Sequence, residues 1–253
     1  MIICHSRRFI FVHIHRTGGT SIELALDRFL CWNDLILGSS PFGEGINNLY
    51  ANRFGLEKHS ALADIESICG DEICRNYYVF ATVRHPLDRL CSLYNFVAAI
   101  VHKWAAQRGI SPNDVGAHIA ADVQAATPAL NWPSSQAFIG TTSFSEFIRD
   151  ERLKADNAFR TQASRLRSLS DGAIHAQFFR LEDRDEWLPR IKEALALDFT
   201  LVHTNKSDLK LITTDAVSHE DRTYVEALFA EDYVTFDYQS IPVIVGQTCA
   251  KSF

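Results

Sequence analysis

The sequence lacks an excess of basic residues. Its 25 lysines and arginines are outnumbered by 31 aspartates and glutamates, so the formal net charge is −6 at pH 7, and the pI is about 5.9. A general nucleic-acid binder carries a basic excess, so we expect no nucleic acid among the partners. A local basic pocket for a small anion is still compatible with this overall charge.

Paired cysteines are also missing. The chain has six cysteines, with no CxxC pair and no zinc-type spacing to histidine. In a chain of this length, that pattern favours reduced thiols over a disulfide framework. The sequence also shows no cluster of metal-ligating residues, so we expect a function that needs no metal.

Long apolar runs are absent as well. A membrane span needs about 20 apolar residues, whereas the run at 241–245 has five. The N-terminal segment MIICHSRRFIFVHIH is interrupted by histidines, and no small-residue cleavage site follows it. It therefore differs from a signal peptide, and we expect a cytoplasmic protein without a membrane span.

The 253 residues contain no low-complexity linker and no internal repeat. Because α/β folds often reach about 250 residues as one unit, we predict a single domain over 1–253. Residues 33–57 are rich in Gly, Asn, Ser and Pro, so we expect an irregular segment there. Residues 108–142 have mixed polarity and several helix breakers, and their pattern assigns no element.

The remaining sequence alternates between strand and helix patterns. Continuous apolar runs at 9–14, 77–83 and 176–181 are typical of strands that are buried on both faces of a parallel sheet. Helical spacing is found at 20–29, 61–69, 86–97, 144–148, 157–169, 187–197 and 217–229. This alternation predicts an α/β fold, with a mostly parallel central sheet flanked by helices. Ligands then bind at the carboxyl ends of the strands.

The first informative motif, HIHRTGGTSI at 13–22, follows the first predicted strand. Two glycines allow the backbone to curl around an anion, and the N-terminus of the next helix adds a partial positive charge. Arg16 adds a full charge with a planar set of donors. The motif therefore indicates a phosphate-binding loop, although it lacks the GxxxxGK[ST] pattern of a Walker A loop. An ordinary strand-to-helix turn with a capping Thr or Ser is the alternative.

The second motif, FATVRHPLDRLCSLYNF at 80–96, follows the second predicted strand. Arg84 stands at the end of that strand, and Ser92 lies two turns into a helix that begins with Pro86. An arginine and a helical hydroxyl in this arrangement can bind a second phosphate. Alternatively, Arg84 forms a salt bridge at the end of the sheet and Ser92 is an ordinary helix residue.

Together, the two segments resemble the sulfotransferases that use 3'-phosphoadenosine-5'-phosphosulfate (PAPS). The resemblance is closer to the carbohydrate-type branch, which includes heparan sulfate 2-O-sulfotransferases and bacterial sulfotransferases. It implies a P-loop-NTPase-like sulfotransferase fold, with Arg84 and Ser92 at the 3'-phosphate. The residues that it places at the 5'-phosphosulfate are Arg16, Thr17, Gly18, Gly19, Thr20 and Ser21.

Weaker similarities follow in order along most of the chain, at 58–65, 160–162, 179–183, 205–207 and 232–238. They imply that His59, in Lys58-His59-Ser60, is the catalytic base, and that Lys206 and Ser207 bind the cofactor. His13 and His15 flank the phosphate loop and compete with His59 for that role. From position and a neighbouring lysine, we expect His59 to be neutral near pH 7, with activity rising through about pH 6–7.

The chain departs from the family pattern at two positions of the first motif. Many relatives carry lysine where this chain has Arg16, and proline is common where it has His15. Arginine cannot donate a proton at ordinary pH, so we assign Arg16 a catalytic role through electrostatic stabilisation of the leaving phosphate.

The resemblance implies in-line transfer of a sulfuryl group from PAPS to an acceptor hydroxyl. The acceptor is then selected by variable loops near 33–57 and 108–142. A glycan or glycolipid is the leading acceptor, and a phenolic or polyketide metabolite is second. Trp132 either stacks on a sugar or fills a gap in the core. Two other functions stay open. An ATP-dependent small-molecule kinase would use Glu182 and Asp183 for Mg²⁺, and a catalytically silent protein would bind the nucleotide without turnover. The sequence does not indicate an oligomeric state.

Overall fold

The computed structural model describes residues 1–122, 127–201 and 209–239. Two predicted cofactor-binding residues, Lys206 and Ser207, lie outside these residues. Within them, no helix is both long enough and apolar enough to cross a membrane.

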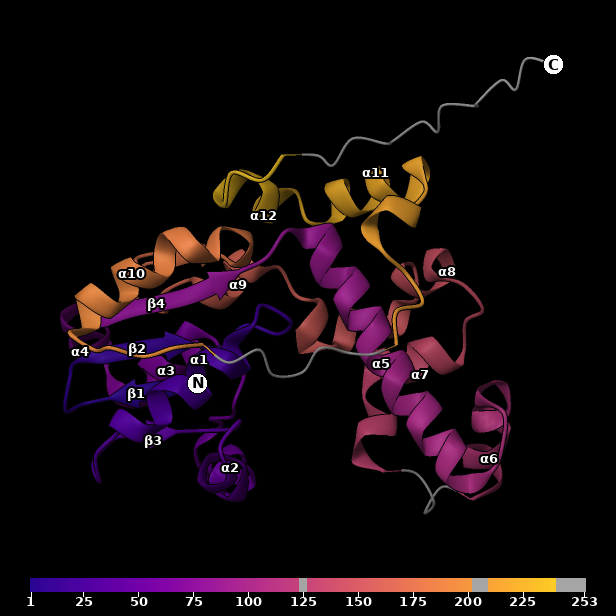
Figure 1. The fold of residues 1–253 in the computed structure, drawn as a ribbon, viewed down its shortest axis with the longest axis horizontal. Helices are drawn as coiled ribbons and strands as arrows, with labels where there is room; N and C mark the ends of the chain where they lie inside the picture. Colours follow the sequence, from indigo (N-terminus) through magenta and orange to yellow (C-terminus); the bar gives the residue numbers. More distant parts are fainter. Residues whose placement is uncertain (123–126, 202–208, 240–253) are drawn as a thin grey trace.

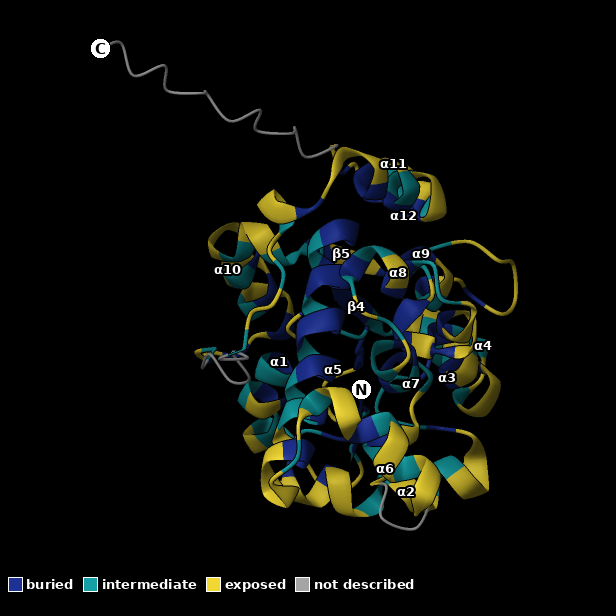
Figure 2. Cartoon of the chain, turned by 90° about the vertical axis from the view of Figure 1, so that its right-hand side faces the viewer, coloured by how far each residue is buried: buried dark blue, intermediate teal, exposed yellow. Residues whose placement is uncertain are grey.

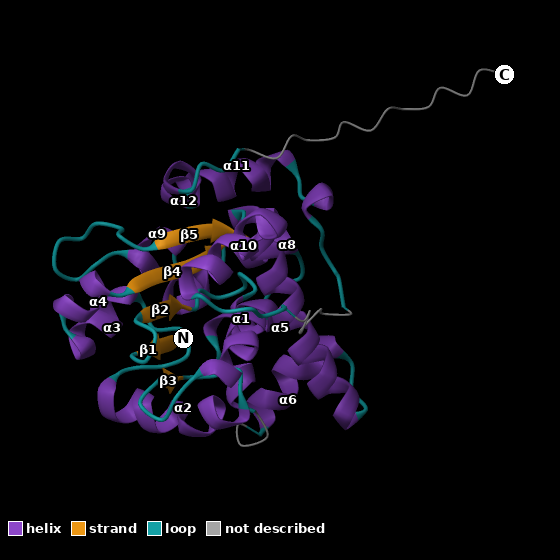
Figure 3. Ribbon diagram, turned by 60° about the vertical axis from the view of Figure 1, so that its left-hand side comes forward, coloured by secondary structure: helices purple, strands orange, loops and turns teal. Residues whose placement is uncertain are grey.

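A five-stranded sheet forms the centre of the α/β fold, in the order β3-β1-β2-β4-β5 (Figure 3). The three strands that the sequence predicts are β2 (Phe9–Val12), β4 (Tyr78–Val83) and β5 (Gln177–Arg180), and they pair in parallel. Two short strands, β1 (Ile2–Cys4) and β3 (Leu35–Ile36), add an antiparallel edge. Because β2 and β4 are parallel, the segments after them meet at one edge of the sheet.

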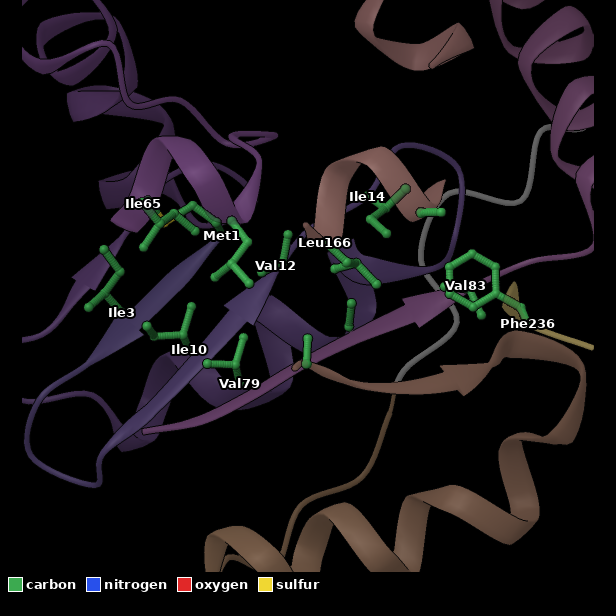
Figure 4. Close-up of a cluster of buried hydrophobic side chains, with 14 of the residues drawn as sticks. Met1, Ile3, Ile10, Val12, Ile14, Ile65, Val79, Val83, Leu166 and Phe236 are labelled. Carbon is green, nitrogen blue, oxygen red and sulfur yellow. The ribbon is translucent and has the colours of Figure 1, made fainter. Parts of the chain in front are cut away.

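Alternation along the strands divides the core between the two faces of the sheet. In β2, Phe9 and Phe11 contribute to one cluster, whereas Ile10 and Val12 contribute to the other. The first cluster packs against α1 (Gly19–Leu26) and α10 (Arg184–Leu195), and the second against α3 (Leu62–Cys69) and α9 (Gln162–Leu166). Figure 4 shows the second cluster, in which Ile65 and Leu166 lie over the strands.

A helical layer is built around α5 (Pro86–Arg108), which follows β4 directly. In Figure 1, α5 runs away from the end of β4, with α6 (Val115–Ala121), α7 (Pro133–Ile139) and α8 (Phe144–Ile148) around it. Its buried face packs against α7 (Pro133–Ile139), α8 (Phe144–Ile148) and α11 (His219–Leu228). Figure 2 accordingly shows much of α5 as buried. This packing fixes the first turns of α5, which carry Arg89 and Ser92, beside the sheet.

The other α-helices are α2 (Pro41–Phe54), α4 (Asp71–Asn76), α6 (Val115–Ala121) and α12 (Ala230–Thr235). Among the described residues, the 3-10 helices are Asp27–Phe29, Pro112–Asp114, Pro128–Asn131, Glu151–Ala155, Asn157–Phe159, Leu181–Asp183 and Thr214–Ala216.

The prediction of an irregular segment at 33–57 was wrong, because this segment contains β3 and α2. Ser40 caps α2 by accepting a hydrogen bond from the Gly43 N–H, Pro41 occupies the first turn, and Gly55 ends the helix in the left-handed region at φ 69°. Gly43 lies close to the end of β3 and the turn after it, since a Cβ there would be 2.5 Å from the Gly38 carbonyl oxygen and 3.1 Å from that of Ile36. Glycines inside α2 weaken its helical pattern in the sequence.

The helix predicted at 157–169 is divided into two pieces. Arg160 is extended, at φ −63° and ψ 155°, and α9 begins after Thr161, whose hydroxyl accepts a hydrogen bond from the Ser164 N–H. This capping competes with continuous helix. The unassigned segment 108–142 contains α6 and α7.

Candidate functional site

A cavity of about 640 Å³ lies where the chain leaves β2 and β4. It is bounded by the loop before α1, the first turns of α5, and segments near α2 and α7. The sequence-predicted residues that line it are Arg16, Gly18, Gly19, Thr20, Ser21, His59, Arg84 and Ser92. The structure therefore brings both motifs and the predicted base together, from three separate stretches of the chain.

The loop between β2 and α1 has an unusual backbone that depends on its glycines. Arg16 and Gly18 both have positive φ, at 65° and 83°, and α1 begins at Gly19. A Cβ on Gly19 would be 2.2 Å from Cδ2 of His13, closer than two carbon atoms can approach. Since the loop ends at the N-terminus of α1, the backbone N–H groups of its first turn and the helix dipole favour an anion in the cavity.

Thr17 is the predicted loop residue whose side chain faces away from the cavity. It is fully buried, its hydroxyl donates to the Ile14 carbonyl at 2.9 Å, and it lies 3.3 Å from the hydroxyl of Thr82. This corrects the prediction for the Thr17 side chain. Its hydroxyl joins the loop to β4, because a buried hydroxyl needs partners in the sheet.

Arg16 extends along α5. Its Nε and Nη2 donate to Oγ of Ser92 at 3.2 and 3.1 Å, and its guanidinium lies 4.3 Å from the centre of the Phe96 ring. Burial, followed by the nearby charge of Arg84, lowers the pKa of Arg16 to about 10. The side chain is therefore still charged at neutral pH, and it lies beside a residue that the sequence assigns to the 3'-phosphate.

Arg84 is held by its backbone at the end of β4. The side chain of Gln162 accepts from the Arg84 N–H and donates to the Arg84 carbonyl, both at 2.8 Å. The buried carboxylate of Asp232 in turn accepts from the backbone N–H groups of Gln162 and Ala163, both at 2.9 Å. Sequence reasoning did not identify this support. Its only signals in the sequence were the family-like segments at 160–162 and 232–238.

The cavity therefore contains two cationic groups without an anionic partner. Nη1 of Arg84 is 3.4 Å from the Arg16 carbonyl oxygen, and the charge of Arg84 disfavours that of Arg16. Among the described residues, neither forms an ion pair with a carboxylate. Two such guanidinium groups in one cavity favour a polyanionic ligand.

His59 is held with one nitrogen committed. Its Nδ1 is 2.9 Å from the His13 carbonyl oxygen, and because a carbonyl only accepts, Nδ1 must carry a proton. In the neutral ring, Nε2 is then the proton acceptor. Burial, followed by His13 and His15, lowers the pKa of His59 well below its usual value. The ring is therefore neutral at pH 7, as a general base must be.

His13 connects the loop to a buried carboxylate that sequence reasoning missed. Nδ1 of His13 lies 2.8 Å from Oε1 of Glu23 on α1. Glu23 is completely buried and also accepts hydrogen bonds from the amino group of Met1 and the hydroxyl of Ser39. Burial alone would raise the pKa of Glu23, but His13 and the amino group of Met1 lower it to about 2. His13 thus has a structural role beneath the loop.

Glu182 and Asp183, on which the kinase alternative depends, lie outside the cavity lining. Glu182 accepts hydrogen bonds from the His85 N–H at 2.8 Å and the Tyr238 hydroxyl at 3.1 Å. Asp183 is 4.0 Å from Arg180. Their carboxylates thus have structural partners, which weakens the kinase interpretation.

Both segments that the sequence assigns to the acceptor contribute to the lining. Trp132 is 43% exposed, and it stacks on Phe96 with ring centres 6.2 Å apart. From the other segment, Glu44 pairs with Lys58 at 3.0 Å, and Glu57 also lines the cavity. The cavity thus extends from the phosphate loop to a partly open end with an aromatic ring and carboxylates.

Comparison with known proteins gave one result. A model of the sulfotransferase family matches residues 1–239, whereas no curated protein and no solved structure matches the chain. The match covers the whole sheet and every residue that lines the cavity. The chain therefore belongs to the sulfotransferase family.

Proposed function

We propose that the chain transfers a sulfuryl group from PAPS to an acceptor hydroxyl. The observation that carries this proposal is the content of one cavity: two guanidinium groups, the N-terminus of α1, and a histidine whose Nε2 is available as a proton acceptor. PAPS has an anionic group at each end of its ribose, and it supplies the sulfuryl group. The two cationic positions suit such a donor better than a single phosphate.

The residues that would hold the donor fall into two groups. Gly18, Gly19, Thr20 and Ser21 would bind the 5'-phosphosulfate through backbone N–H groups and hydroxyls. Arg84 and Ser92 would bind the 3'-phosphate, and we assign Lys206 and Ser207 to the same end. Arg16 lies between the two groups, since its side chain starts in the loop and its guanidinium reaches Ser92.

In the reaction, His59 would accept the proton of the attacking hydroxyl at Nε2. The N-terminus of α1, the hydroxyls of Thr20 and Ser21, and Arg16 would stabilise the negative charge that develops on the departing phosphate. With a pKa of about 10, Arg16 acts as a fixed charge and not as a proton donor. None of these steps assigns a role to a metal ion.

For the acceptor, we propose a glycan or glycolipid hydroxyl. The Trp132 ring can stack on the apolar face of a sugar, and Glu44 and Glu57 would repel a densely sulfated polymer. A phenolic or polyketide metabolite is the alternative acceptor. We further propose that 1–253 forms one sulfotransferase domain and that it acts in the cytoplasm.

The test is a comparison of ligand-induced stabilisation. At a concentration 100 times its dissociation constant, 3'-phosphoadenosine-5'-phosphate should stabilise the protein by about 2.7 kcal/mol, clearly more than ATP–Mg²⁺ at the same concentration. As a control, Arg84→Ala should weaken binding of this nucleotide about tenfold to a hundredfold, while adenosine 5'-phosphosulfate is affected much less. Preference for ATP–Mg²⁺ would favour a kinase.

Turnover requires a second assay. Transfer of labelled sulfuryl groups from PAPS to a panel of sugar and phenolic acceptors should give a product with at least one class. Tight nucleotide binding without any product across the panel would favour the catalytically silent protein.

A further inference from the structure

His15 lies against His59 across the cavity lining. The two rings are stacked with centres 3.6 Å apart and planes inclined by 26°, and both residues line the cavity.

His59 is consequently confined on several sides. His15 covers one face of its ring, the ring of His13 meets it edge-on at 4.5 Å, and the His13 carbonyl holds Nδ1 at 2.9 Å. The backbone carbonyl of His59 accepts a hydrogen bond from Nη2 of Arg165 on α9. A ring fixed in this way cannot rotate to exchange its two nitrogens.

We propose that His15 is a positioning residue for His59, with its imidazole serving as the wall that keeps His59 Nε2 available to the substrate hydroxyl. This inference rests on the proposed function of His59 as the base. It assigns His15 no proton transfer of its own.

The charges around this pair explain why a flat neutral ring suits position 15. The charged or titratable groups that face it come from the loop before α1, from α5, from α9 and from the segment before α3. These groups are His13, Arg16, Arg89 and Arg165, with the amino group of Met1, Lys58 and Glu23 around His13. Most are cationic or neutral, so a second positive charge is disfavoured. Burial, followed by the charges of His13, Arg165, Arg89 and Arg16, lowers the pKa of His15 well below its usual value.

Two substitutions at position 15 distinguish the packing role of the flat ring from any role of its nitrogen atoms. His15→Phe keeps a flat ring of similar position but has no nitrogen, so most of the turnover should be retained. His15→Ala removes the wall and should lower kcat about tenfold or more, because small misplacements of a catalytic group are costly, while the KM for PAPS changes little. His118→Ala, on the exposed surface of α6, is the matched control.

A titration of the histidine rings by NMR tests the same point without turnover. In the wild type and in His15→Phe, His59 should remain neutral, with the proton on Nδ1, to well below pH 6.5. In His15→Ala, water reaches the ring, so its pKa should rise toward the ordinary value. If the chain proves not to transfer sulfuryl groups, this arm still decides whether His15 positions His59.

Two outcomes would overturn the proposal. If His15→Ala shows wild-type kcat and an unchanged His59 titration, the wall has no function. If His15→Phe is as inactive as His59→Ala, His15 acts through its nitrogens and is itself a proton acceptor. Because Phe preserves the packing, His15→Phe remains informative even if His15→Ala fails to fold.

Discussion

Single residues determine how closely the phosphate loop approaches the sheet, and Gly19 is the clearest case. The ring of His13 fills the space where a side chain at position 19 would begin, with ring atoms 2.2 to 2.8 Å from an ideal Cβ. The same ring is held on its other side by Glu23 at 2.8 Å. A larger residue at position 19 must therefore displace a buried histidine together with its partner.

We predict that Gly19→Ala destabilises the protein by about 1–3 kcal/mol, the usual cost of overpacking a tight site. For a chain of this size, each kcal/mol corresponds to a fall of about 2–4 °C in Tm. The control is Gly45→Ala in α2, where a Cβ meets nothing within 4 Å, and its Tm should be unchanged or slightly raised. Equal melting temperatures for the two variants would contradict this account of the loop.

His59 gives the second prediction at this scale. His59→Ala should leave nucleotide binding nearly intact and reduce kcat by about 10²–10⁴. Because its pKa is lowered, mainly by burial, the ring loses its base form only as pH falls well below 6.5. Turnover of the wild type should thus stay level from pH 8 to below 6.5 and decline only well below that pH, at lower pH than the sequence alone indicated. A decline that begins above pH 7 would exclude His59 as the base.

Among the elements, those with strong local patterns were predictable. β2, β4 and β5 are continuous apolar runs, and the start of α5 is marked by Pro86, so these elements were identified close to their observed bounds. The edge strands were missed because β1 has only three residues and β3 only two, and because β3 pairs with a segment far earlier in the chain. The start of α9 was also missed. Thr161 caps this helix, but the helical spacing of residues 157–169 predicted one continuous helix across that cap.

The connection between α12 and α9 supports Arg84 from behind, and this gives a prediction at the level of elements. Asp232→Ala would leave the buried N–H groups of Gln162 and Ala163 without their acceptor, at a cost of about 1–3 kcal/mol for each buried unsatisfied group. Since Gln162 holds the backbone of Arg84, affinity for 3'-phosphoadenosine-5'-phosphate should also fall. Calorimetry on the variant measures both effects.

The neighbouring carboxylate provides the control. Glu231 is 36% exposed and pairs with Arg167 on the surface, so Glu231→Ala should change stability by less than about 1 kcal/mol. If both variants bind the nucleotide like the wild type, the connection supports the fold but not the site.

For the molecule as a whole, the sequence identified most residues of the candidate site but not their partners. The glycine loop, Arg84 and Ser92 follow from motifs, and their meeting in one cavity follows from parallel strands. The contact of Arg16 with Ser92, the inward turn of Thr17 and the burial of Glu23 depend on distances between segments far apart in the chain. Glu23 in particular reads as an ordinary charged residue of a short helix.

Glu23 links three regions of the molecule, so its titration should be visible in global stability. Its pKa is about 2 in the folded protein, against 4.5 without partners. A lowered pKa means that the carboxylate stabilises the fold above pH 4.5 and that this contribution is lost as pH falls from 4.5 toward 2. The difference corresponds to about 3 kcal/mol at neutral pH.

We therefore predict that Glu23→Gln is less stable than the wild type at pH 7, and that its free energy of unfolding falls less steeply between pH 5 and pH 3. Urea unfolding across this range measures both, with Glu186→Gln on the exposed side of α10 as the control. If Glu23→Gln instead reproduces the wild-type slope, the acid sensitivity must come from other carboxylates, and Glu23 would not be the charged centre that joins α1, β2 and the segment before α2.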